Sequence, residues 1–335
     1  MNSIFLQKTI LVFPLIICIQ ITALSQEKKN SFIKSNTGKL GIVYDKRYLD
    51  YIFRKGSFES PYRLFALIQS LKNSDLAGYI TWLTPNKKAE QFLPLIHTQK
   101  HIEKILRDER TGKAALLAAS GALCGIDAVM TSKVSSVFCA IRPPGHHARN
   151  KGREEGFCYF NNAALAARYA QNKYRIKRVL IVDWDYHHGN GTEEIFYEDS
   201  TVFFFSTHNA NDFPGTGSPR RKGKKAGKGL SINVHLRCRT KDNDIITAFK
   251  QKLLPAAEVF KPELVVISAG FDSRKGDPLG CFDISDYGFY TLTNICLTIA
   301  EKYSENRIVS IFEGGYNPEG NAWAVLSHCK ALLRL

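Results

Sequence analysis

Short runs of β-branched and aromatic residues alternate with longer amphipathic stretches from residue 39 to the end of the chain. Several short runs are almost entirely apolar, which is typical of strands that are buried on both faces of a parallel sheet. The longer stretches have the periodicity of helices that cover such a sheet. Strands are predicted at Leu40–Tyr44, Ser135–Ile141, Arg178–Val182, Thr201–Ser206, Leu230–Val234, Glu263–Ser268 and Arg307–Phe312.

The amphipathic stretches predict helices between and after these strands. They are Pro61–Lys72, Gln99–Leu106, Lys113–Ala128, Phe160–Ala170, Thr192–Phe196, Asn243–Phe260, Ser285–Tyr303 and Glu319–Arg334. The connections are short, no repeat is found, and no linker divides this part of the chain. Strands that alternate with helices in this way predict one doubly wound α/β domain over residues 39–335.

The N-terminal segment has the pattern of a targeting sequence. An apolar run from Ile10 to Ala23 is too short to span a bilayer, which needs about 20 apolar residues. Ala23-Leu24-Ser25 then offers small residues at the two positions that a signal peptidase reads. We expect residues 1–25 to be a cleaved secretory signal and residues 26–38 to be a polar N-terminal segment. An uncleaved anchor or an amphipathic leader is the alternative.

A cleaved signal would send the mature protein to the periplasm or out of the cell. No other segment is predicted to span a membrane, so no membrane contact is expected after cleavage. Eight cysteines are present, and Cys18 belongs to the leader. The remaining seven form no CxxC pair and stand mostly among apolar or small residues, so we expect buried thiols rather than a disulfide framework.

The chain is strongly basic. Among its 335 residues, 46 Lys+Arg against 31 Asp+Glu give a formal net charge of +15, which favours anionic partners. The densest basic run, residues 220–228, has no interleaved aromatic residue that could stack on bases. Such a run supplies only non-specific affinity for phosphates, so no specific nucleic-acid partner is predicted.

Reactive side chains follow five of the predicted strands. Ligands of an open parallel sheet bind outside the carboxyl ends of its strands, so these five segments are expected to meet at one edge. The segments are Arg142–His147, Asp183–Gly191, Ser206–His208, Ala269–Asp272 and Glu313–Tyr316.

Asp185 and His187 are two residues apart, so their side chains project to the same side of an extended segment. Asp272, after another strand, can supply a third ligand. Each residue alone would more often be an ordinary hydrogen-bonded side chain, but the combination favours a metal centre. Carboxylate and imidazole ligands with an open position suit zinc or a similar divalent ion in a catalytic site.

His146 and His147 follow a Pro-Pro-Gly turn, which presents two adjacent imidazoles in a fixed direction. Activation of water at a metal needs a base, and release of an amine needs an acid; two oriented histidines can supply both. Asp183 and Asn190 are the expected acceptors that orient them. The neighbouring His188 is predicted to have a structural role.

Tyr316 follows Glu313-Gly314-Gly315, in which the two glycines permit a close approach of the backbone. A phenol at a strand exit can donate a hydrogen bond to a carbonyl oxygen and stabilise a developing oxyanion. Tyr316 is therefore a candidate for this part of an amide hydrolysis.

Several long motifs occur in one order: RPPGHHA, GFCYFNNAALAA, VDWDYHHGNGT, PGTG, SAGFDSRKGDPLG and EGGYN. From Leu40 to the C-terminus the chain resembles the zinc-dependent histone deacetylase superfamily, most closely its class II branch and bacterial deacetylase-like amidohydrolases. The resemblance implies an arginase-like three-layer fold with a central, mostly parallel eight-stranded sheet. It also implies hydrolysis of an acyl amide on a lysine-like amine.

The resemblance assigns a role to each matching position. It implies that His146 pairs with Asp183, that His147 pairs with Asn190, and that Tyr316 polarises the acyl carbonyl. Class I members have an aspartate at the position of Asn190, whereas class II members have an asparagine. The implied zinc ligands are Asp185, His187 and Asp272. The implied substrate tunnel is lined by Gly156, Phe157, Phe213 and Leu279. An implied structural potassium ion is held by Asp183, Asp185, His187, Ser206 and Thr207.

Two departures bear on the substrate. Relatives grip the substrate backbone with an acidic residue on a long segment, whereas this chain passes quickly through residues 105–112 into a helix and offers only Asp108 or Glu109. Polyamine-selective members carry an acidic gatekeeper at the position of Leu279, so this chain is expected to prefer acetyl-lysine. An acetylpolyamine deacetylase and an inactive module that binds acylated ligands remain the alternatives, and the exported location argues against histones as the substrate.

Overall fold

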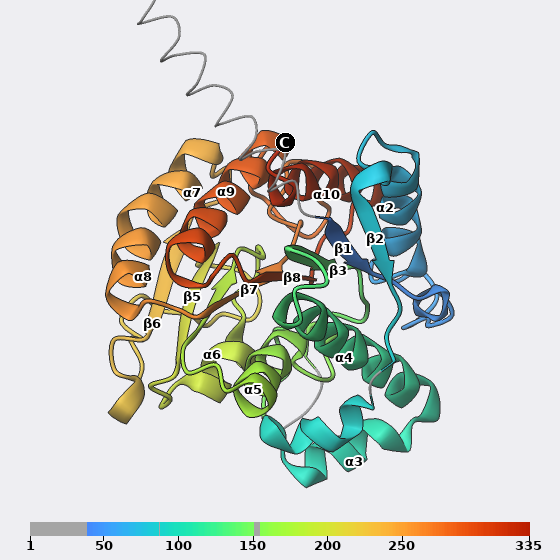
Figure 1. The fold of residues 1–335 in the computed structure, drawn as a ribbon, viewed down its shortest axis with the longest axis horizontal. Helices are drawn as coiled ribbons and strands as arrows, with labels where there is room; N and C mark the ends of the chain where they lie inside the picture. The colour runs from blue at the N-terminus through green and yellow to red at the C-terminus, as the bar shows by residue number, and fades with distance from the viewer. Residues whose placement is uncertain (1–38, 87, 151–154) are drawn as a thin grey trace, which may run out of the picture. The chain divides into compact units, whose positions relative to one another are not determined.

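The computed structural model describes residues 39–86, 88–150 and 155–335. Eight strands form one sheet in the order β2-β1-β3-β8-β7-β4-β5-β6, and every neighbouring pair is parallel (Figure 1). Residues 39–335 form one compact unit. The strands are β1 (Leu40–Val43), β2 (Ile80–Leu83), β3 (Ser136–Cys139), β4 (Val179–Asp183), β5 (Val202–Asn209), β6 (Ser231–Leu236), β7 (Leu264–Ala269) and β8 (Ile308–Phe312).

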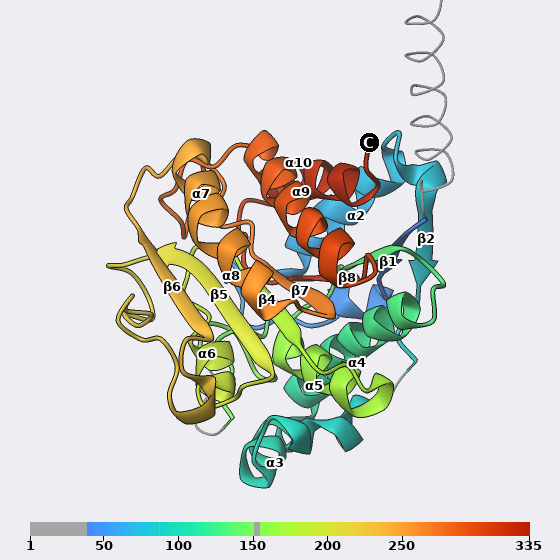
Figure 2. The same cartoon turned by 60° about the vertical axis from the view of Figure 1, so that its left-hand side comes forward.

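Helices cover both faces of this sheet, which confirms the predicted three-layer fold. Helices α2, α7, α8, α9 and α10 lie on one side, and α3, α4, α5 and α6 lie on the other (Figures 1 and 2). Their bounds are α2 (Pro61–Asn73), α3 (Gln99–Arg107), α4 (Glu109–Met130), α5 (Asn162–Tyr174), α6 (Asn190–Phe196), α7 (Asp242–Ala248), α8 (Leu254–Phe260), α9 (Asp286–Tyr303) and α10 (Pro318–Leu332).

Strand β2 was absent from the sequence prediction. It lies at the edge of the sheet and pairs with β1 alone, and only Leu83 among its four residues is buried. Trp82 is 40% exposed. A short edge strand with one covered face lacks the continuous apolar run that identified the central strands, which explains the omission.

The predicted helix Asn243–Phe260 is divided into α7, a π-helical turn (Phe249–Leu253) and α8. Pro255 stands in the first turn of α8. Because proline has no N–H and its ring displaces the carbonyl four residues earlier, the regular hydrogen-bond pattern is interrupted there. The prediction was right about the helical stretch and wrong about its regularity.

Helix α4 is the one described helix that is long and apolar enough to cross a membrane. Most of its apolar stretch is buried inside the protein. It packs against β1, β3 and α5 as a core helix. Gly121 and Gly125 permit the close approach, because an added Cβ would lie 2.4 Å from Tyr48 Oη and 2.5 Å from Cys139 Sγ, respectively. The length of α4 therefore reflects burial in the core.

The structure corrects the prediction that the cysteines are all free thiols. Cys238, after β6, and Cys281, on the segment that follows β7, form a disulfide with their Cα atoms 5.1 Å apart. The expectation of free thiols holds for Cys139, Cys158, Cys296 and Cys329, which are buried, and for the partly buried Cys124. The pair was missed because 43 residues separate its members. The predicted signal and polar segment, residues 1–38, lie outside the described residues and stay a prediction.

Candidate metal centre and active site

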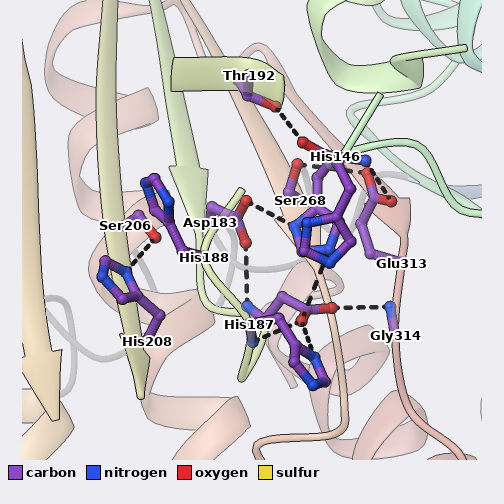
Figure 3. A network of polar contacts seen from close by, with 12 residues as sticks. His146, Asp183, His187, His188, Thr192, Ser206, His208, Ser268, Glu313 and Gly314 are labelled. Carbon is purple, nitrogen blue, oxygen red and sulfur yellow. Dashed lines mark hydrogen bonds and ion pairs between the residues drawn. The ribbon is translucent and has the colours of Figure 1, made fainter. Parts of the chain in front are cut away.

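The candidate residues lie at the carboxyl ends of β3, β4, β5, β7 and β8, as the strand-end rule predicted (Figure 3). β4 ends at Asp183, so Asp185 and His187 stand on the loop directly beyond it. Asp272 follows β7 by three residues, and Glu313 directly follows β8. Strands β8, β7, β4 and β5 are neighbours in the sheet, so these loops converge on one site.

Asp185, His187 and Asp272 form a cluster that could hold a metal ion. His187 Nδ1 lies 3.2 Å from Asp185 Oδ1 and 2.9 Å from Asp272 Oδ2. One ligand atom from each residue lies within 4.8 Å of the others. Both carboxylates are fully buried, whereas the imidazole reaches the surface of the site. One nitrogen and two carboxylate oxygens that face the same point make a donor set suited to a first-row divalent ion.

Backbone groups hold the two carboxylates in place. Gly314 N donates to Asp185 Oδ2 (2.8 Å), and Tyr186 N donates to Asp272 Oδ1 (2.8 Å). An added Cβ at Gly314 would lie 2.2 Å from Asp272 Oδ2, and one at Gly270 would lie 2.0 Å from Asp185 Oδ2. These glycines therefore leave room for the ligands, and the preformed cradle fits a bound cation.

The charges around the cluster favour a cation as well. Burial and the neighbouring Asp185 raise the pKa of Asp272 to about 7. Burial opposes protonation of His187, but Asp185 and Asp272 outweigh it and raise the pKa of His187 to about 11. Two close carboxylates thus need a positive charge between them, and a divalent ion can replace the proton on His187.

Glu313 fixes the turn that carries the two histidines. Its Oε2 atom accepts hydrogen bonds from Gly145 N (2.6 Å) and His146 N (3.2 Å), as Figure 3 shows in part. Burial raises the pKa of Glu313 to about 7. The sequence indicated the Pro-Pro-Gly turn but gave no sign of this anchor, because Glu313 is 167 residues from His146.

The two histidines have different partners. His146 Nδ1 lies 3.0 Å from Asp183 Oδ2, and His147 Nδ1 lies 2.8 Å from Asn190 Oδ1, so the predicted pairs are in contact. Burial opposes protonation of His146, but Asp185 and Asp183 raise its pKa to about 10. Burial and the positive charges of His146 and His187 hold the pKa of His147 well below its usual range. His146 therefore stays a cation beside a carboxylate, whereas His147 stays neutral beside an amide.

Tyr316 is held from two sides. Asp277 Oδ2 accepts a hydrogen bond from Tyr316 N (2.6 Å), and the Arg63 guanidinium carbon lies 4.6 Å from the centre of the phenol ring. Arg63 also donates to Gly315 O (2.5 Å). Burial raises the pKa of the Tyr316 phenol well above its ordinary value, so the hydroxyl remains a donor. Neither Arg63 nor Asp277 was singled out from the sequence, because both act from distant segments.

Two of the four predicted tunnel residues adjoin His147, and the other two lie near Tyr316 or its anchor. Phe157 lies 5.8 Å from the Tyr316 ring, and Phe213, which is 44% exposed, lies 4.9 Å from the His147 ring. Gly156 adjoins His147. Leu279 is partly buried, and its N–H donates to Asp277 Oδ1 (2.8 Å), which joins the predicted gatekeeper to the anchor of Tyr316.

Three further predicted positions are Ser206, Thr207 and His188, and the contacts of Ser206 and His188 are with residues other than the three candidate metal ligands. Ser206 Oγ contacts His208 Nδ1 (2.9 Å), and the buried Thr207 Oγ1 has no hydrogen-bond partner among the described residues. The implied potassium site thus stays a prediction. His188 Nδ1 contacts Thr216 Oγ1 (2.7 Å), and burial lowers the pKa of His188 to about 2, which agrees with a structural role. Figure 3 shows Ser206, His188 and His208 to one side of His187.

Asp108 and Glu109 have local roles. Asp108 Oδ1 accepts from Thr111 N (2.7 Å) and caps α4, and Glu109 pairs with Lys113 (2.5 Å) one turn along the same helix. Both contacts stabilise the start of α4. Among residues 39–86, 88–150 and 155–335 that the structure describes, neither contact reaches the candidate active site.

The basic run is a folded loop. Arg221 Nε pairs with the buried Glu193 (2.7 Å), and Lys224 and Lys225 approach Glu198 at 3.8 Å and 2.7 Å. Asn233 Nδ2 donates to Arg221 O (3.2 Å). These contacts give part of the run a structural role, and the expectation that it binds no specific nucleic acid stays a prediction.

Comparison with known proteins places this geometry in a family. Residues 57–332 match the histone deacetylase domain. Histone deacetylase 15 of Arabidopsis thaliana is 35% identical over 333 residues, covering 92% of this chain and 59% of that protein. A probable deacetylase of Archaeoglobus fulgidus is 33% identical over 296 residues, covering 84% of this chain and 82% of its own length. This chain thus spans less than two thirds of the plant protein.

Two further similarities concern the substrate and the fold. Polyamine deacetylase HDAC10 of Mus musculus is 35% identical over 302 residues, covering 82% of this chain and 45% of that protein. The crystal structure of the HDA15 HD domain superposes with a TM-score of 0.83 at 35% identity and covers 89% of both chains. The similarity therefore extends over most of this chain.

Proposed function

The chain belongs to the histone deacetylase family, and from this membership and the geometry of its site we propose that it is a zinc-dependent hydrolase that removes acetyl or similar acyl groups from lysine side chains. The observation that carries the proposal is the position of His146, His147 and Tyr316 at the Asp185–His187–Asp272 cluster. His146 Nε2 lies 3.7 Å from Asp185 Oδ1, the His147 ring lies 6.0 Å from the His187 ring, and the charges of Asp272 and Asp185 act on the Tyr316 phenol. A neutral imidazole base, a second imidazole and a phenol donor at one cluster can together supply the proton transfers and the oxyanion contact of amide hydrolysis.

Zinc held by the cluster would polarise the acyl carbonyl and lower the pKa of a water molecule beside it. The neutral His147 takes a proton from this water as its oxygen attacks the carbonyl carbon. The phenol of Tyr316 stabilises the negative charge that develops on the carbonyl oxygen, and His146, paired with Asp183 and 3.7 Å from Asp185, is a second donor at the cluster. His147 then returns the proton to the amine as the C–N bond breaks.

A substrate panel tests the proposal. The zinc-reconstituted protein would be assayed with acetyl-lysine peptides, longer acyl-lysine peptides, free acetyl-lysine and acetylpolyamines. The proposal predicts zinc-dependent release of acetate or another short acid from lysine substrates. Zinc binding with measurable affinity for acylated ligands and no release of acid would instead support the alternative of a binding module.

Polyamine deacetylation is the second candidate, because one relative carries that name. Leu279 argues against it here. A carboxylate at this position would attract a distant ammonium by roughly 1 to 4 kcal/mol at 4 Å before desolvation is subtracted, whereas leucine offers no charge. We therefore propose that acetyl-lysine peptides are preferred over N-acetylspermidine.

We expect Leu279→Glu to shift the ratio of the two kcat/KM values towards N-acetylspermidine by about tenfold, which corresponds to roughly 1.4 kcal/mol. Leu279→Gln is the matched control, because it has a similar length without the charge and should leave the ratio almost unchanged. Steady-state kinetics with both substrates on all three proteins measures the effect. A preference of the unmodified enzyme for N-acetylspermidine would replace the leading proposal with the second candidate.

We also propose that the protein is exported. The apolar run that ends in Ala23-Leu24-Ser25 supports this, and so does the Cys238–Cys281 disulfide, because disulfides persist mainly in oxidising compartments. N-terminal sequencing of protein made in its own host should give a start near Gln26. A cytosolic product that retains Met1 would contradict export. A structural potassium ion beside Ser206 and Thr207 is a further proposal that metal analysis of the purified protein can test.

A further inference from the structure

The turn Glu155–Cys158 wraps around His147. Cys158 N donates to Glu155 O (2.9 Å), and Gly156 and Phe157 adopt φ angles of +54° and +67°. An added Cβ at Gly156 would lie 2.2 Å from His147 Cδ2, so only glycine fits against this face of the imidazole. The turn that carries Phe157 thus also places Glu155 close to Asn190, the hydrogen-bond partner of His147.

That partner, Asn190, uses both ends of its amide. Its Oδ1 atom lies 2.8 Å from His147 Nδ1, and its Nδ2 atom donates to Glu155 Oε2 (3.0 Å). A carboxylate accepts hydrogen bonds and has none to donate. Glu155 therefore requires the NH₂ group of Asn190 to face it, which leaves the carbonyl oxygen facing His147.

This orientation determines where His147 carries its proton. A carbonyl oxygen at 2.8 Å from Nδ1 accepts a hydrogen bond, so Nδ1 carries the hydrogen and Nε2 has a free lone pair. The opposite amide orientation would place NH₂ against Nδ1 and require the hydrogen on Nε2, which would remove the base. An amide needs an external group to choose between these states, whereas the Asp183 carboxylate accepts from His146 in either orientation.

We propose that Glu155 is a positioning residue that fixes the amide of Asn190 and, through it, the Nδ1–H tautomer of His147; its catalytic consequence rests on the proposed deacetylase function. Arg149 supports the arrangement, because its Nη2 atom lies 3.3 Å from Glu155 Oε2. Glu155 itself is separated from the imidazole by the amide. It acts on the reaction by keeping His147 a base.

Glu155→Ala tests the inference. We expect kcat to fall by about tenfold, the lower end of the range for residues that orient a catalytic ligand, while KM and zinc content stay close to those of the unmodified protein. The direct readout is the ¹⁵N NMR spectrum of the histidine rings in the metal-free protein, assigned with a His147→Ala spectrum. The unmodified protein should show a protonated Nδ1 at His147, and Glu155→Ala should show a mixture of tautomers.

Two further variants separate this role from a general structural one. Glu194→Gln is the matched control, because the Glu194 side chain also pairs with Arg149 (3.6 Å) and, within the described part of the chain, does not bond to the Asn190 amide; this change should leave kcat and the His147 spectrum unchanged. Asn190→Asp should restore turnover in the Glu155→Ala background, since a carboxylate accepts from Nδ1 in any orientation. In the presence of Glu155, the same Asn190→Asp change should lower turnover by placing two carboxylates together.

The outcomes are distinguishable from failure of the proposed function. If the unmodified protein hydrolyses no acylated amine, the deacetylase proposal fails, while the NMR comparison still tests the tautomer. If the unmodified enzyme is active and Glu155→Ala keeps both its kcat and a fully protonated Nδ1, Glu155 does not position His147. Loss of activity in Glu155→Ala without rescue by Asn190→Asp would also overturn the inference.

Discussion

Asp272→Ala and Asp185→Ala should each lose bound zinc and turnover together. Each change deletes an oxygen of the three-residue cluster, in which the ligand atoms lie within 4.8 Å of one another. Loss of a partner that only orients a ligand typically costs about 10–100-fold in metal affinity, so loss of the ligand itself should cost at least about 100-fold. The ion is expected to contribute several kcal/mol to transition-state stabilisation, and about 4 kcal/mol corresponds to a rate loss of roughly 10³-fold.

Zinc content by elemental analysis and turnover of an acetyl-lysine peptide are the two measurements. Asp283→Ala is the control, because Asp283 lies on the same segment as Asp272 but pairs with Arg239 (3.6 Å) instead of facing the cluster. It should keep zinc and turnover. Thermal unfolding of each variant separates loss of the ion from loss of the fold. Full zinc occupancy in both Asp272→Ala and Asp185→Ala would mean that other residues hold the metal.

The central strands were predictable because burial on both faces imposes a simple pattern. Residues 179–182 are all apolar and all fully buried, as a strand between two helical layers must be. Strand β2 has one buried residue in four, so its sequence looks like a loop. The difference lies in how much of each strand the helices cover, which is a property of the tertiary structure.

The metal cluster was predictable for a related reason. The two-residue spacing of Asp185 and His187 places them on one side of an extended segment, and parallel strands end at a common edge, where Asp272 also stands. The supporting contacts follow no such rule. Glu155 reaches Asn190 across 35 residues, and Asp277 reaches Tyr316 across 39, both from irregular loops. Their roles depend on loop conformations that local patterns do not specify.

The chemical demands on each residue explain why the metal ligands were predictable and the supporting residues were not. Metal ligands and general bases must be particular residue types, so their chemistry is visible in the sequence. A residue that only has to accept a hydrogen bond can be any of several types at any loop position that reaches the donor. Sequence reasoning therefore identified the groups that are proposed to contact substrate, but it gave no anchoring role to Arg63, Asp277, Glu155 or Glu313.

Tyr316→Phe should keep the fold and the zinc and lose most of the turnover. The backbone N–H of Tyr316 is bound to Asp277 (2.6 Å), and Arg63 lies against the ring (4.6 Å), so neither anchor depends on the hydroxyl group. A phenylalanine ring should therefore occupy the same place. What is lost is one hydrogen-bond donor to the oxyanion, and removal of such a donor typically lowers kcat by about 10² to 10³-fold.

The same reasoning predicts how the loss of activity in Tyr316→Phe divides between kcat and KM. The hydroxyl acts on charge that develops in the transition state, so kcat should fall while KM for an acetyl-lysine peptide changes little. Tyr169→Phe is the matched control, because it deletes a hydroxyl of α5 that bonds to Asp127 of α4 (2.9 Å) and should affect stability alone. Steady-state kinetics, zinc analysis and thermal unfolding of both variants make the comparison. A wild-type kcat in Tyr316→Phe would assign the oxyanion contact to another group and leave the buried phenol a packing role.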